Sequence, residues 1–446
     1  MSFSAAKLLA LLQAHVPDGA TGFVVGLSGG ADSSALLAAL VQLRGTNHLL
    51  PVRALHIDHG LQDAAASFRE ASESLCGALG VPLSIIAVPV LAPTGVSIEA
   101  AARDARYAAL GAQLQAGECL LTAHHGEDQA ETLLLQALRG AGLKGLASMP
   151  ICREFAAGWH LRPLLGVRRD DLRQFAAAKG IAGALDPMNA DPRYDRVYLR
   201  RTLWPLIEAR WPGAGPALAR SAAHAAEAQD LLDAIADADL ANLRDGEALS
   251  VTHLRRLAAA RRINALRRWI GEAKAVPPPA ARLIEALRQM LVADADHLPA
   301  VAWDAHALRR YRDRLFMSAA VPPRLALEHQ WDPRVQQRLE LGAGLGALRC
   351  VERPNALDRR RLPDTLRVRP RAGGETLKPS PSAATRSVQH LCQEFGVLPW
   401  MRDALPFVYA GGDLIAIGDL WLEARWCATG GAPGLAFDWV DAPNLV

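Results

Sequence analysis

Apolar runs and helical periods alternate along the first 150 residues of the chain. Four short apolar runs predict strands at residues 23–27, 52–57, 83–88 and 119–123. Between and after them, apolar residues recur every three or four positions, which predicts helices near residues 33–43, 67–79, 98–116 and 128–138. Single helices between short strands are typical of an α/β fold with a doubly wound parallel sheet. In such sheets, ligands bind beyond the carboxyl ends of the strands.

The pattern changes along the rest of the chain. Residues 151–215 look like an extension of the first domain, and a Pro/Gly-rich stretch at 212–216 is the best linker candidate. Residues 216–320 are rich in Ala, Leu and Arg with a helical period, which predicts a small helical domain. We therefore expect domains at residues 1–215 and 216–320, a connecting segment at 321–366 and a small C-terminal α/β domain at 367–446.

Composition narrows the class of protein. Half of the 446 residues are hydrophobic and 21% are charged, which favours ordered cores over disorder. Charges, glycines or prolines interrupt every apolar run, so we expect no membrane span. The six cysteines are scattered, without a CxxC pair or a zinc-ligand spacing, which favours reduced thiols in the cytoplasm. The net charge of +3 is mild, so binding to nucleic acid would need local basic patches.

A glycine turn directly after the first predicted strand is the strongest candidate site. It consists of Ser28, Gly29, Gly30, Ala31, Asp32 and Ser33. Glycines let backbone N–H groups approach phosphate oxygens, and the helix that follows adds the positive end of its dipole. The turn lacks the lysine of the GxxxxGK[ST] loop, which suits pyrophosphate as a leaving group better than transfer of a γ-phosphoryl group. An ordinary strand–helix turn is the alternative.

A second polar cluster follows the fourth predicted strand, at residues 122–132. If the helix begins near Glu127, then Asp128 and Glu131 share one face of it. Two carboxylates there could hold Mg²⁺ on pyrophosphate, orient a cationic substrate or accept a proton from an amine. An acidic first turn that merely suits the helix dipole explains the pattern equally well. The two neighbouring histidines lack a third ligand at a usual spacing, so zinc is not expected.

Arginines form the remaining candidate sites. A helix near residues 98–116 carries Arg103 and Arg106 three positions apart, where they either face solvent or reach a phosphate. A broad basic face over residues 254–270 suits an RNA backbone about as well as it suits plain solvation. A second basic run, residues 353–371, leads into the last part of the chain.

Several segments resemble known proteins. The loop at 28–33 is similar to the pyrophosphate loop of the N-type ATP pyrophosphatases, which adenylate a carbonyl-type oxygen and release pyrophosphate. Further segments resemble the tRNA(Ile)-lysidine synthetases of that superfamily, in the expected order. They lie at residues 56–62, 97–107, 124–132, 162–165, 186–200, 266–270, 371–375 and 393–402. The resemblance covers nearly the whole chain, and the series of motifs carries it.

The resemblance implies a reaction in two steps. The C2 oxygen of the wobble cytidine in isoleucine tRNA with a CAU anticodon attacks the α-phosphate of ATP, and pyrophosphate leaves. The amine of free L-lysine then attacks C2, and AMP leaves. ATP would lie on the loop from Ser28 to Ser33, beside His56 and Asp58. A cytoplasmic enzyme is implied, and a homodimer is compatible with this fold.

The resemblance also assigns residues to roles. Asp32, Asp128 and Glu131 are expected to be catalytic, with Asp32 and Asp128 as ligands of Mg²⁺. The expected substrate-binding residues are Arg103, Arg106, His124, Glu127, Arg162, Arg196 and Arg200. The helical and C-terminal domains are expected to bind tRNA through Arg255, Arg256, Arg267, Arg268, Arg371 and Arg402. The catalytic base stays unassigned.

Four positions depart from the family pattern. Glu127 stands where the family usually has aspartate, and Val197 where it often has asparagine. The pair at 389–390 is Gln-His where the family often has two lysines. A tRNA thiolase on the same fold is the closest alternative, although it usually needs a cysteine pattern that this sequence lacks. A non-catalytic, nucleotide-dependent tRNA-binding protein is the alternative of another class, and the intact loop argues against it.

Overall fold

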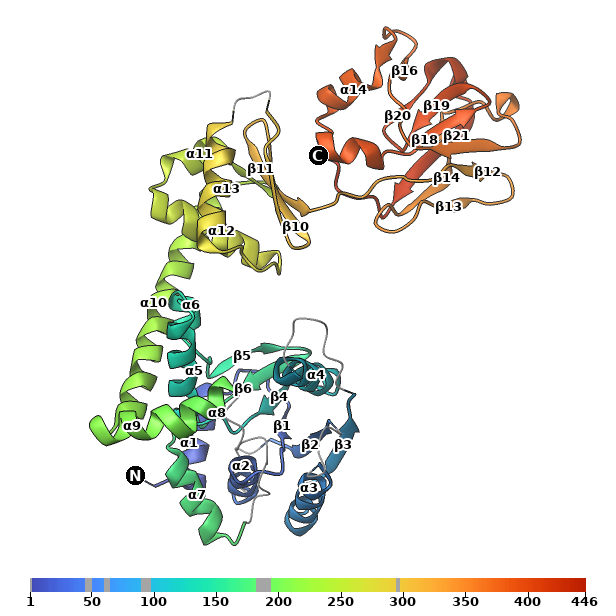
Figure 1. The fold of residues 1–446 in the computed structure, drawn as a ribbon. Coiled ribbons are helices and arrows are strands. Elements are labelled where there is room, and N and C mark those ends of the chain that lie inside the picture. The colour runs from blue at the N-terminus through green and yellow to red at the C-terminus, as the bar shows by residue number, and fades with distance from the viewer. Residues whose placement is uncertain (1, 45–49, 60–64, 90–97, 182–193, 294–296) are drawn as a thin grey trace. The chain divides into compact units, whose positions relative to one another are not determined.

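The computed structural model describes residues 2–44, 50–59, 65–89, 98–181, 194–293 and 297–446. It forms two compact units, Met1–Leu232 and Asp233–Val446, which are described separately (Figure 1). The division falls inside the helix α10 (Ala214–Leu243). The Pro/Gly-rich stretch at 212–216 thus includes the first turn of this helix, where proline is tolerated. The finer division into four parts stays a prediction.

A six-stranded sheet organises the N-terminal unit, and it confirms the predicted doubly wound parallel architecture. Its strand order is β3 (Leu83–Ala87), β2 (Val52–Asp58), β1 (Gly22–Gly26), β4 (Glu118–Leu121), β6 (Gly158–Leu161) and β5 (Cys152–Phe155). The central strand β1 pairs in parallel with both β2 and β4. The edge strand β5 is antiparallel to β6. All four strands predicted in the first 150 residues are present, and the hairpin β5–β6 is additional.

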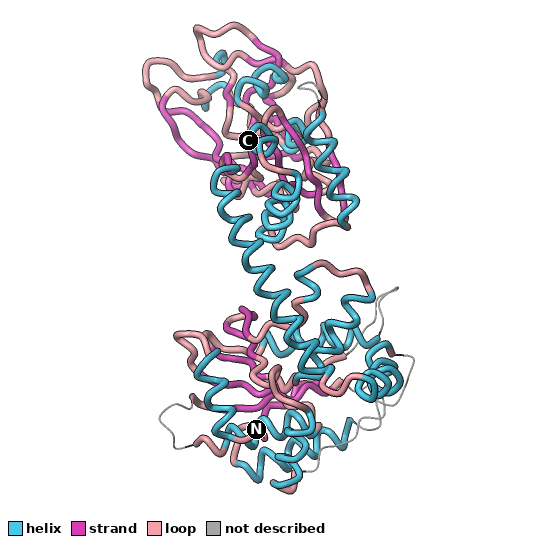
Figure 2. Tube along the Cα trace, turned by 90° about the vertical axis from the view of Figure 1, so that its left-hand side faces the viewer, coloured by secondary structure: helices cyan, strands magenta, loops and turns pink. Residues whose placement is uncertain are grey.

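Helices cover both faces of this sheet (Figures 1 and 2). The helices of this unit are α1 (Ala5–His15), α2 (Ala31–Val41), α3 (Ala65–Leu79), α4 (Ile98–Ala112), α5 (Gly126–Leu138), α6 (Leu143–Leu146), α7 (Arg169–Ala178), α8 (Asp195–Tyr198) and α9 (Trp204–Arg210), with a π-helical turn at Leu199–Leu203. A hydrophobic core lies on each face of the sheet, and alternate residues of β1 point into one core or the other. Phe23 and Val25 pack with residues of α1, α2 and α7 on one face. Val24 packs with Leu110 and Leu114, at and just after the end of α4, on the other face.

This topology positions the candidate site. The chain leaves β1 through the loop at residues 27–30 and enters α2, and it leaves β4 through residues 122–125 and enters α5. Because β1 and β4 are neighbours in parallel register, their carboxyl ends lie at the same edge of the sheet. The two polar segments singled out in the sequence are therefore brought together at one edge.

The first part of the C-terminal unit combines helices with an antiparallel sheet. The helices α11 (Val251–Arg256), α12 (Ala259–Glu272) and α13 (Ala280–Val292) agree with the expected helical domain. The sheet order is β7 (Arg244–Asp245), β8 (Ala248–Ser250), β11 (Arg314–Ala319), β10 (His306–Tyr311) and β9 (Ala300–Trp303). This sheet was not expected as part of the helical domain. Two of its strands, β7 and β8, are only two and three residues long, and the other three follow the last helix.

The last part of the chain forms two further sheets and one longer helix, α14 (Val388–Phe395). One sheet has the order β12 (His329–Trp331), β15 (Leu366–Arg369), β18 (Phe407–Ala410), β19 (Asp413–Ile417) and β20 (Trp421–Leu422). The other has the order β13 (Arg338–Glu340), β14 (Ala347–Pro354) and β21 (Pro433–Val440), and a small ribbon joins β16 (Thr376–Leu377) to β17 (Arg386–Ser387). Short 3₁₀ turns lie at Arg359–Arg361, Pro399–Ala404 and Ala424–Trp426.

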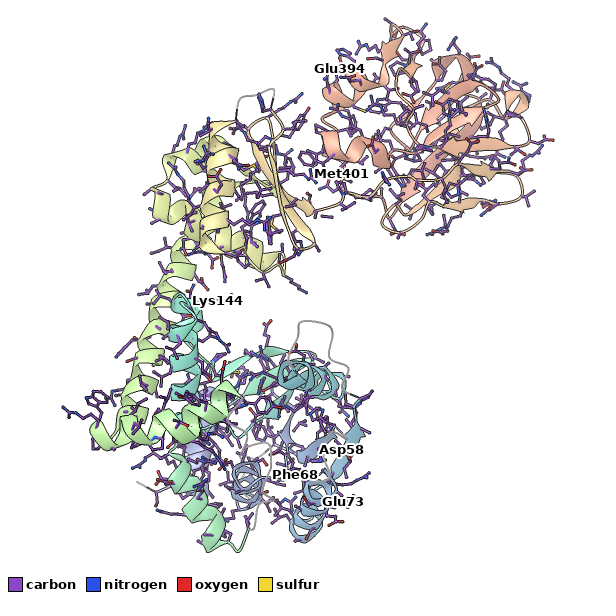
Figure 3. The ribbon with its side chains drawn as sticks, in the orientation of Figure 1. Asp58, Phe68, Glu73, Lys144, Glu394 and Met401 are labelled. Atoms are coloured by element: carbon purple, nitrogen blue, oxygen red, sulfur yellow. The ribbon has the colours of Figure 1, made fainter. Side chains whose placement is uncertain are left out.

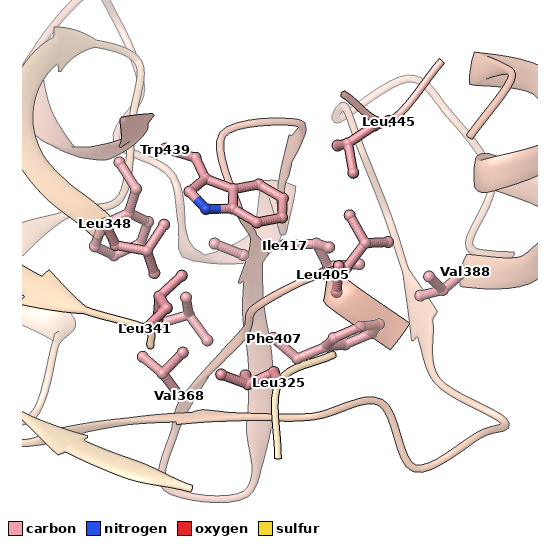
Figure 4. Close-up of a cluster of buried hydrophobic side chains, with 14 of the residues drawn as sticks. Leu325, Leu341, Leu348, Val368, Val388, Leu405, Phe407, Ile417, Trp439 and Leu445 are labelled. Carbon is pink, nitrogen blue, oxygen red and sulfur yellow. The ribbon is translucent and has the colours of Figure 1, made fainter. Parts of the chain in front are cut away.

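The segment at 321–366 differs from the expected connecting segment. Its strand β12 pairs with β15, and β14 pairs with β21 along eight residue pairs. Its side chains also enter the same core: Leu348 packs in one buried cluster with Phe407 and Trp439 (Figure 4). The segment therefore folds with the C-terminal domain, because the packing partners of its apolar residues lie on strands later in the chain.

No helix among the described residues is long and apolar enough to cross a membrane.

Candidate active site

The loop at residues 27–33 is closed by its own side chains. The Ser33 hydroxyl donates to the carbonyl of Gly30 at 3.1 Å and accepts the backbone N–H of Ser28 at 3.2 Å. The two hydroxyls of Ser28 and Ser33 lie 3.0 Å apart. Gly30 is the N-cap of α2 and provides no side-chain cap, while its own N–H lies 3.4 Å from the Ser28 hydroxyl. The loop thus places a helix N-terminus and two hydroxyls together, which suits a phosphate chain.

Gly29 allows this loop to form. Its φ of +77° lies in the left-handed region, and a Cβ atom there would come within 2.8 Å of the carbonyl oxygen of Phe68. Phe68 belongs to α3, where Figure 3 labels it. Glycine is therefore the residue that fits both the backbone conformation and the space between the loop and α3.

His56 lies under this loop. Its ring is buried, and its Nδ1 lies 2.9 Å from the carbonyl oxygen of Leu27, to which it donates. The Ser72 hydroxyl of α3 lies 3.4 Å from the same nitrogen. His56 thus holds the first residue of the loop in place instead of offering Nδ1 to a nucleotide. Asp58 is the last residue of β2, at the same edge of the sheet as the loop (Figure 3).

His125 lies at the centre of three carboxylates. Its Nε2 is 3.7 Å from Asp32 Oδ2 and 3.4 Å from Asp128 Oδ2, and its Nδ1 is 3.1 Å from Glu127 Oε2. Its side chain is only 3% exposed. Burial opposes protonation, but Glu127 and the charges of Asp128 and Asp32 outweigh it and raise the pKa of His125. The glycine loop and the start of α5 therefore meet at this imidazole.

The start of α5 is fixed by backbone hydrogen bonds. The N–H of His125, the N-cap residue, donates to Asp128 Oδ2 at 3.1 Å, and the N–H of Gly126 donates to the carbonyl of Val167 at 2.9 Å. Glu127 accepts the N–H of Arg169, the first residue of α7, at 2.9 Å. His125 was not among the candidate residues chosen from the sequence. Its position directly before the first helical residue was the available signal, because N-cap side chains point back over the helix terminus.

Arg200 binds both carboxylates that the sequence placed on one face of α5. Its Nε and Nη2 donate to the two oxygens of Glu131 at 2.7 and 2.8 Å, and Nη2 also lies 3.1 Å from Asp128 Oδ1. The sequence suggested that Asp128 and Glu131 could hold Mg²⁺, orient a cationic substrate or accept a proton, and in this structure the guanidinium of Arg200 already pairs with both. Arg196, on the preceding turn, donates to the Thr132 hydroxyl at 3.0 Å.

The opposite side of the site is cationic. The guanidinium carbons of Arg103 and Arg106 lie 5.6 and 5.4 Å from the centre of the Tyr107 ring. Burial lowers the pKa of Arg106, and the charge of Arg103 lowers it further. Burial is the largest cause that lowers the pKa of His124, and the charges of Arg162, Arg106 and Arg103 lower it further. Four of the predicted substrate-binding residues therefore do come together.

Arg162 lies below these side chains and begins a chain of hydrogen bonds. Its side chain is buried, and Nη2 lies 3.0 Å from His160 Nδ1. His160 Nε2 lies 2.9 Å from the Thr122 hydroxyl, which lies 2.8 Å from His124 Nδ1. Arg162 also donates to the carbonyl of Pro150 at 2.8 Å. Arg162 thus contacts His160 and Pro150 in this structure, and its expected role in substrate binding stays a prediction.

The residues present fit a magnesium ion bound together with phosphates. No group of three or more His, Cys, Asp or Glu side chains in the described part of the chain is arranged as a metal site. Mg²⁺ usually needs only one or two protein carboxylates, since phosphates and waters complete its shell. Asp32 is the better candidate because its side chain is 31% exposed, whereas Asp128 is bonded to both His125 and Arg200.

The predicted tRNA-binding arginines differ in whether their guanidinium groups already form hydrogen bonds within the protein. Arg268 donates to Asp237 at 2.7 and 3.0 Å, and Arg255 donates to the carbonyl of Leu291. Arg402 lies 3.4 Å from the carbonyl of Val397. The exposed residues of this set are Arg255, Arg256 and Arg267, whereas Arg268, Arg371 and Arg402 are partly buried.

Comparison with protein families agrees with this geometry. Residues 3–207 match a model described as a PP-loop domain. Residues 249–316 match the TilS substrate binding domain, and residues 366–439 match the TilS substrate C-terminal domain. The parallel sheet, the lysine-free glycine loop and the carboxylate cluster at the same edge define a PP-loop protein that binds ATP.

The relatives narrow this class further. The chain is 40% identical to the tRNA(Ile)-lysidine synthase of Alkalilimnicola ehrlichii, over 92% of each protein. It is 38% identical to that of Methylococcus capsulatus, over 92% of this chain and 93% of the relative, and 39% identical to that of Pseudomonas aeruginosa, over 92% of each. The chain belongs to the tRNA(Ile)-lysidine synthase family.

Solved structures of lower similarity each cover about half of this chain. The U34-tRNA thiolase NcsA from Methanococcus maripaludis is 14% identical, with a TM-score of 0.41 over 49% of this chain and 77% of that chain. An NH3-dependent NAD synthetase from Campylobacter jejuni is also 14% identical, with a TM-score of 0.30 over 50% of this chain and 93% of that chain.

Proposed function

We propose that this chain converts the wobble cytidine of isoleucine tRNA with a CAU anticodon into lysidine, using ATP and free L-lysine. The observation that supports this most directly is the meeting of Asp32 and Asp128 at one nitrogen of His125. It joins the glycine loop and the acidic start of α5 into a single site. A phosphate-binding loop and a carboxylate cluster within one site suit adenylation followed by attack of an amine.

The first step activates the nucleobase. The C2 oxygen of cytidine forms a bond to the α-phosphorus of ATP, and the bond from that phosphorus to the β-phosphate oxygen breaks, so that pyrophosphate leaves. The loop from Ser28 to Ser33 would hold the phosphates through backbone N–H groups and hydroxyls. Asp32 would hold Mg²⁺ with Asp128 beside it, and the ion would offset the charge of the leaving pyrophosphate.

The second step forms the carbon–nitrogen bond. The ε-nitrogen of lysine bonds to C2, the bond between C2 and its oxygen breaks, and AMP leaves. The attacking amine must be neutral, since an ammonium has no lone pair. Arg200 already pairs with Glu131 and Asp128. We therefore propose that Arg200 either moves away from these carboxylates when lysine binds or shares them with the lysine amine.

Buried cysteines disfavour a thiolase. Cys119 is completely buried, and burial raises the pKa of its thiol to about 11. Burial also raises the pKa of Cys152, the next cysteine along the chain. A thiol of this kind stays protonated at neutral pH and is a weak nucleophile. This leaves the attacking nitrogen of an amine as the better-supported nucleophile of the second step.

The test is incorporation of labelled lysine into unmodified isoleucine tRNA with a CAU anticodon in the presence of ATP and Mg²⁺. We expect one AMP and one pyrophosphate for each lysine incorporated. Release of pyrophosphate without label in the tRNA would contradict the proposal. Sedimentation of the same preparation tests the homodimer, and fractionation of cells tests the cytoplasmic location.

The matched variants are Asp32→Ala and Asp170→Ala. Asp32 faces His125 from the loop, so its removal should abolish adenylation while tRNA binding persists. Asp170 lies on α7, where its side chain is 66% exposed beside Arg168, so its removal should leave lysidine formation unchanged. Adenylation that survives in Asp32→Ala would remove Asp32 from the proposed role.

A further inference from the structure

The hydrogen bonds between Arg162 and His124 have a defined direction. A guanidinium has only donors, so His160 Nδ1 must accept the hydrogen bond from Arg162 Nη2 at 3.0 Å. The proton of a neutral His160 then resides on Nε2, which donates to the Thr122 hydroxyl oxygen at 2.9 Å. Among the described residues, the remaining partner of that hydroxyl is His124 Nδ1, at 2.8 Å. The hydroxyl proton therefore goes to His124.

This direction decides which nitrogen of His124 carries a proton. Nδ1 accepts from Thr122, so a neutral His124 carries its proton on Nε2. Nε2 has no hydrogen-bond partner within the part of the chain that the structure describes, and it is not among the buried, unpartnered atoms. His124 is half-buried, so Nε2 is not fully shielded and is free to donate to a ligand, and the charges of Arg103 and Arg106 act on this imidazole.

Both histidines are neutral near pH 7. Burial, followed by the charge of Arg162, lowers the pKa of His160 to about 2, and Arg153 and Arg103 act in the same direction. Burial is also the largest cause for His124, whose pKa falls to about 3. The groups that face His124 are Asp128, which favours its protonation, and Arg162, Arg106 and Arg103, which oppose it.

We propose that Arg162, His160 and Thr122 form a positioning chain that holds His124 as the Nε2–H tautomer, so that His124 enters the reaction as a neutral hydrogen-bond donor and not as a base. With Nδ1 engaged and Nε2 protonated, His124 has no lone pair free to take a proton from the lysine amine. A neutral imidazole that donates to an oxygen gaining negative charge is an effective electrophile. The acceptor is an oxygen of the adenylated intermediate. This choice of acceptor rests on the proposed function.

The tautomer can be measured directly in the wild-type chain. In protein labelled with ¹⁵N-histidine, the two ring nitrogens report which one is protonated, and a His124→Gln variant identifies the signals of His124. We expect Nε2–H for both His124 and His160 at pH 7. A Nδ1–H tautomer or an imidazolium at His124 would overturn the proposal, whether or not the protein makes lysidine.

Kinetics of matched variants test whether the chain positions His124. Thr122→Val removes the hydroxyl at nearly constant volume, and we expect kcat for lysidine formation to fall about 10- to 100-fold with little change in KM for ATP. Thr122→Ser restores the hydroxyl and should recover most of that loss. The spectrum of Thr122→Val should also show mixed tautomers at His124. If Val and Ser variants are equally impaired, or if Val retains full kcat, Thr122 does not act through its hydroxyl.

A control separates this role from general damage. Thr21 lies just before β1, and its hydroxyl bonds the carbonyl of Ala116 at 3.1 Å, away from the edge that carries the site. Thr21→Val therefore removes a hydroxyl whose backbone partner lies outside the site, and it should leave kcat unchanged. His160→Gln gives a second variant of the chain, since its amide can still donate to Thr122. It should be less impaired than His160→Phe, and the reverse order would count against the chain.

Discussion

Arg200 holds both oxygens of the Glu131 carboxylate, with Nε 2.7 Å from Oε1 and Nη2 2.8 Å from Oε2. Glu131 is 2% exposed, so its charge is stabilised by this guanidinium and not by water. Removing one partner of a buried ion pair leaves the other uncompensated. We expect Arg200→Met to lower the free energy of unfolding by about 2 kcal/mol, less than for a fully buried pair, since the Arg200 side chain is 29% exposed.

Urea denaturation at pH 7 measures this loss. Arg139→Met is the matched control, because Arg139 pairs with Asp195 at 3.0 Å while both side chains are more than half exposed. An exposed pair of this kind contributes less than about 0.5 kcal/mol. Equal losses in the two variants would show that the Arg200–Glu131 pair gains nothing from its burial.

Two neighbouring glycines should respond differently to alanine. Gly29 has a φ of +77°, and an added Cβ would lie 2.8 Å from the Phe68 carbonyl oxygen. Gly30 has a φ of −82°, and its added Cβ would come no nearer than 3.4 Å to the Ser28 hydroxyl. We expect Gly29→Ala to cost at least about 1–2 kcal/mol of stability and to abolish ATP-dependent adenylation.

Gly30→Ala should cost clearly less stability, because its backbone needs no left-handed conformation. Thermal unfolding compares the two variants directly, and pyrophosphate release reports the state of the loop. If both variants unfold at the same temperature, the contact between the loop and α3 does not restrict Gly29.

His125 should make stability depend on pH above neutrality. Glu127 and two aspartates raise the pKa of His125 in the folded chain, despite its burial. A raised folded pKa gives stability that is fully present below the unfolded pKa of about 6.5 and is lost as pH rises through the folded pKa. We therefore expect the cost of His125→Gln to be largest near pH 6 and to shrink toward pH 9, by at most about 1.4 kcal/mol per pH unit.

The measurement is urea denaturation of both proteins from pH 6 to 9, in buffer without divalent cations. His224→Gln is the control, since His224 and Glu227 are 76% and 75% exposed and lie 3.6 Å apart. A cost of His125→Gln that stays constant over this range would mean that the imidazole does not carry a charge among the three carboxylates.

His160 should make stability depend on pH in the opposite sense, below about pH 6.5. Its folded pKa of about 2 lies far below that of an unfolded histidine, mainly because of burial. The unfolded chain therefore takes up a proton below pH 6.5 that the folded chain does not, and stability falls as pH decreases. Between pH 6 and 4, the wild-type chain should lose stability through His160 at up to about 1.4 kcal/mol per pH unit. We expect His160→Gln to abolish this part of the loss. Unfolding of wild-type and variant chains at pH 6, 5 and 4 tests it, with the exposed His253→Gln as control.

Local patterns were sufficient to predict most of the N-terminal sheet. The strands β1 to β4 follow short continuous apolar runs, and the helices between them follow the 3.6-residue period of their apolar positions. The hairpin β5–β6 was not predicted. Its turn at Ala156 has a φ of +50°, but this position lacks the glycine or asparagine that usually marks such turns. Tertiary contacts of the strands evidently hold that turn in place.

The candidate site was predictable only in part. The i,i+3 spacing put Asp128 and Glu131 on one face, and the topology put the glycine loop beside them. Their partner Arg200 lies 69 residues from Glu131 along the chain, so no local pattern could join them. Likewise, neighbouring histidines look alike in a sequence, and only the N-cap geometry separates the buried His125 from His124.

The arginines of α12 provide a test of RNA binding. Arg268 is engaged with Asp237 at 2.7 and 3.0 Å, whereas Arg267, next to it, is exposed. If α12 contacts tRNA phosphates, Arg267 is the residue with a free charge to offer them. We expect Arg267→Ala to weaken binding of isoleucine tRNA and to reduce the slope of log K against log salt by about 1.

Arg268→Ala should change that slope much less, because its charge is already balanced inside the protein. Salt-titrated binding of wild type and both variants, with a tRNA of another sequence as competitor, measures the two effects. A phosphate contact weakens binding to both tRNAs alike, since the backbone carries no sequence information. If Arg267→Ala leaves the slope unchanged, or if Arg268→Ala lowers it equally, the exposed charge of α12 serves solvation and the RNA contact lies elsewhere in the C-terminal unit.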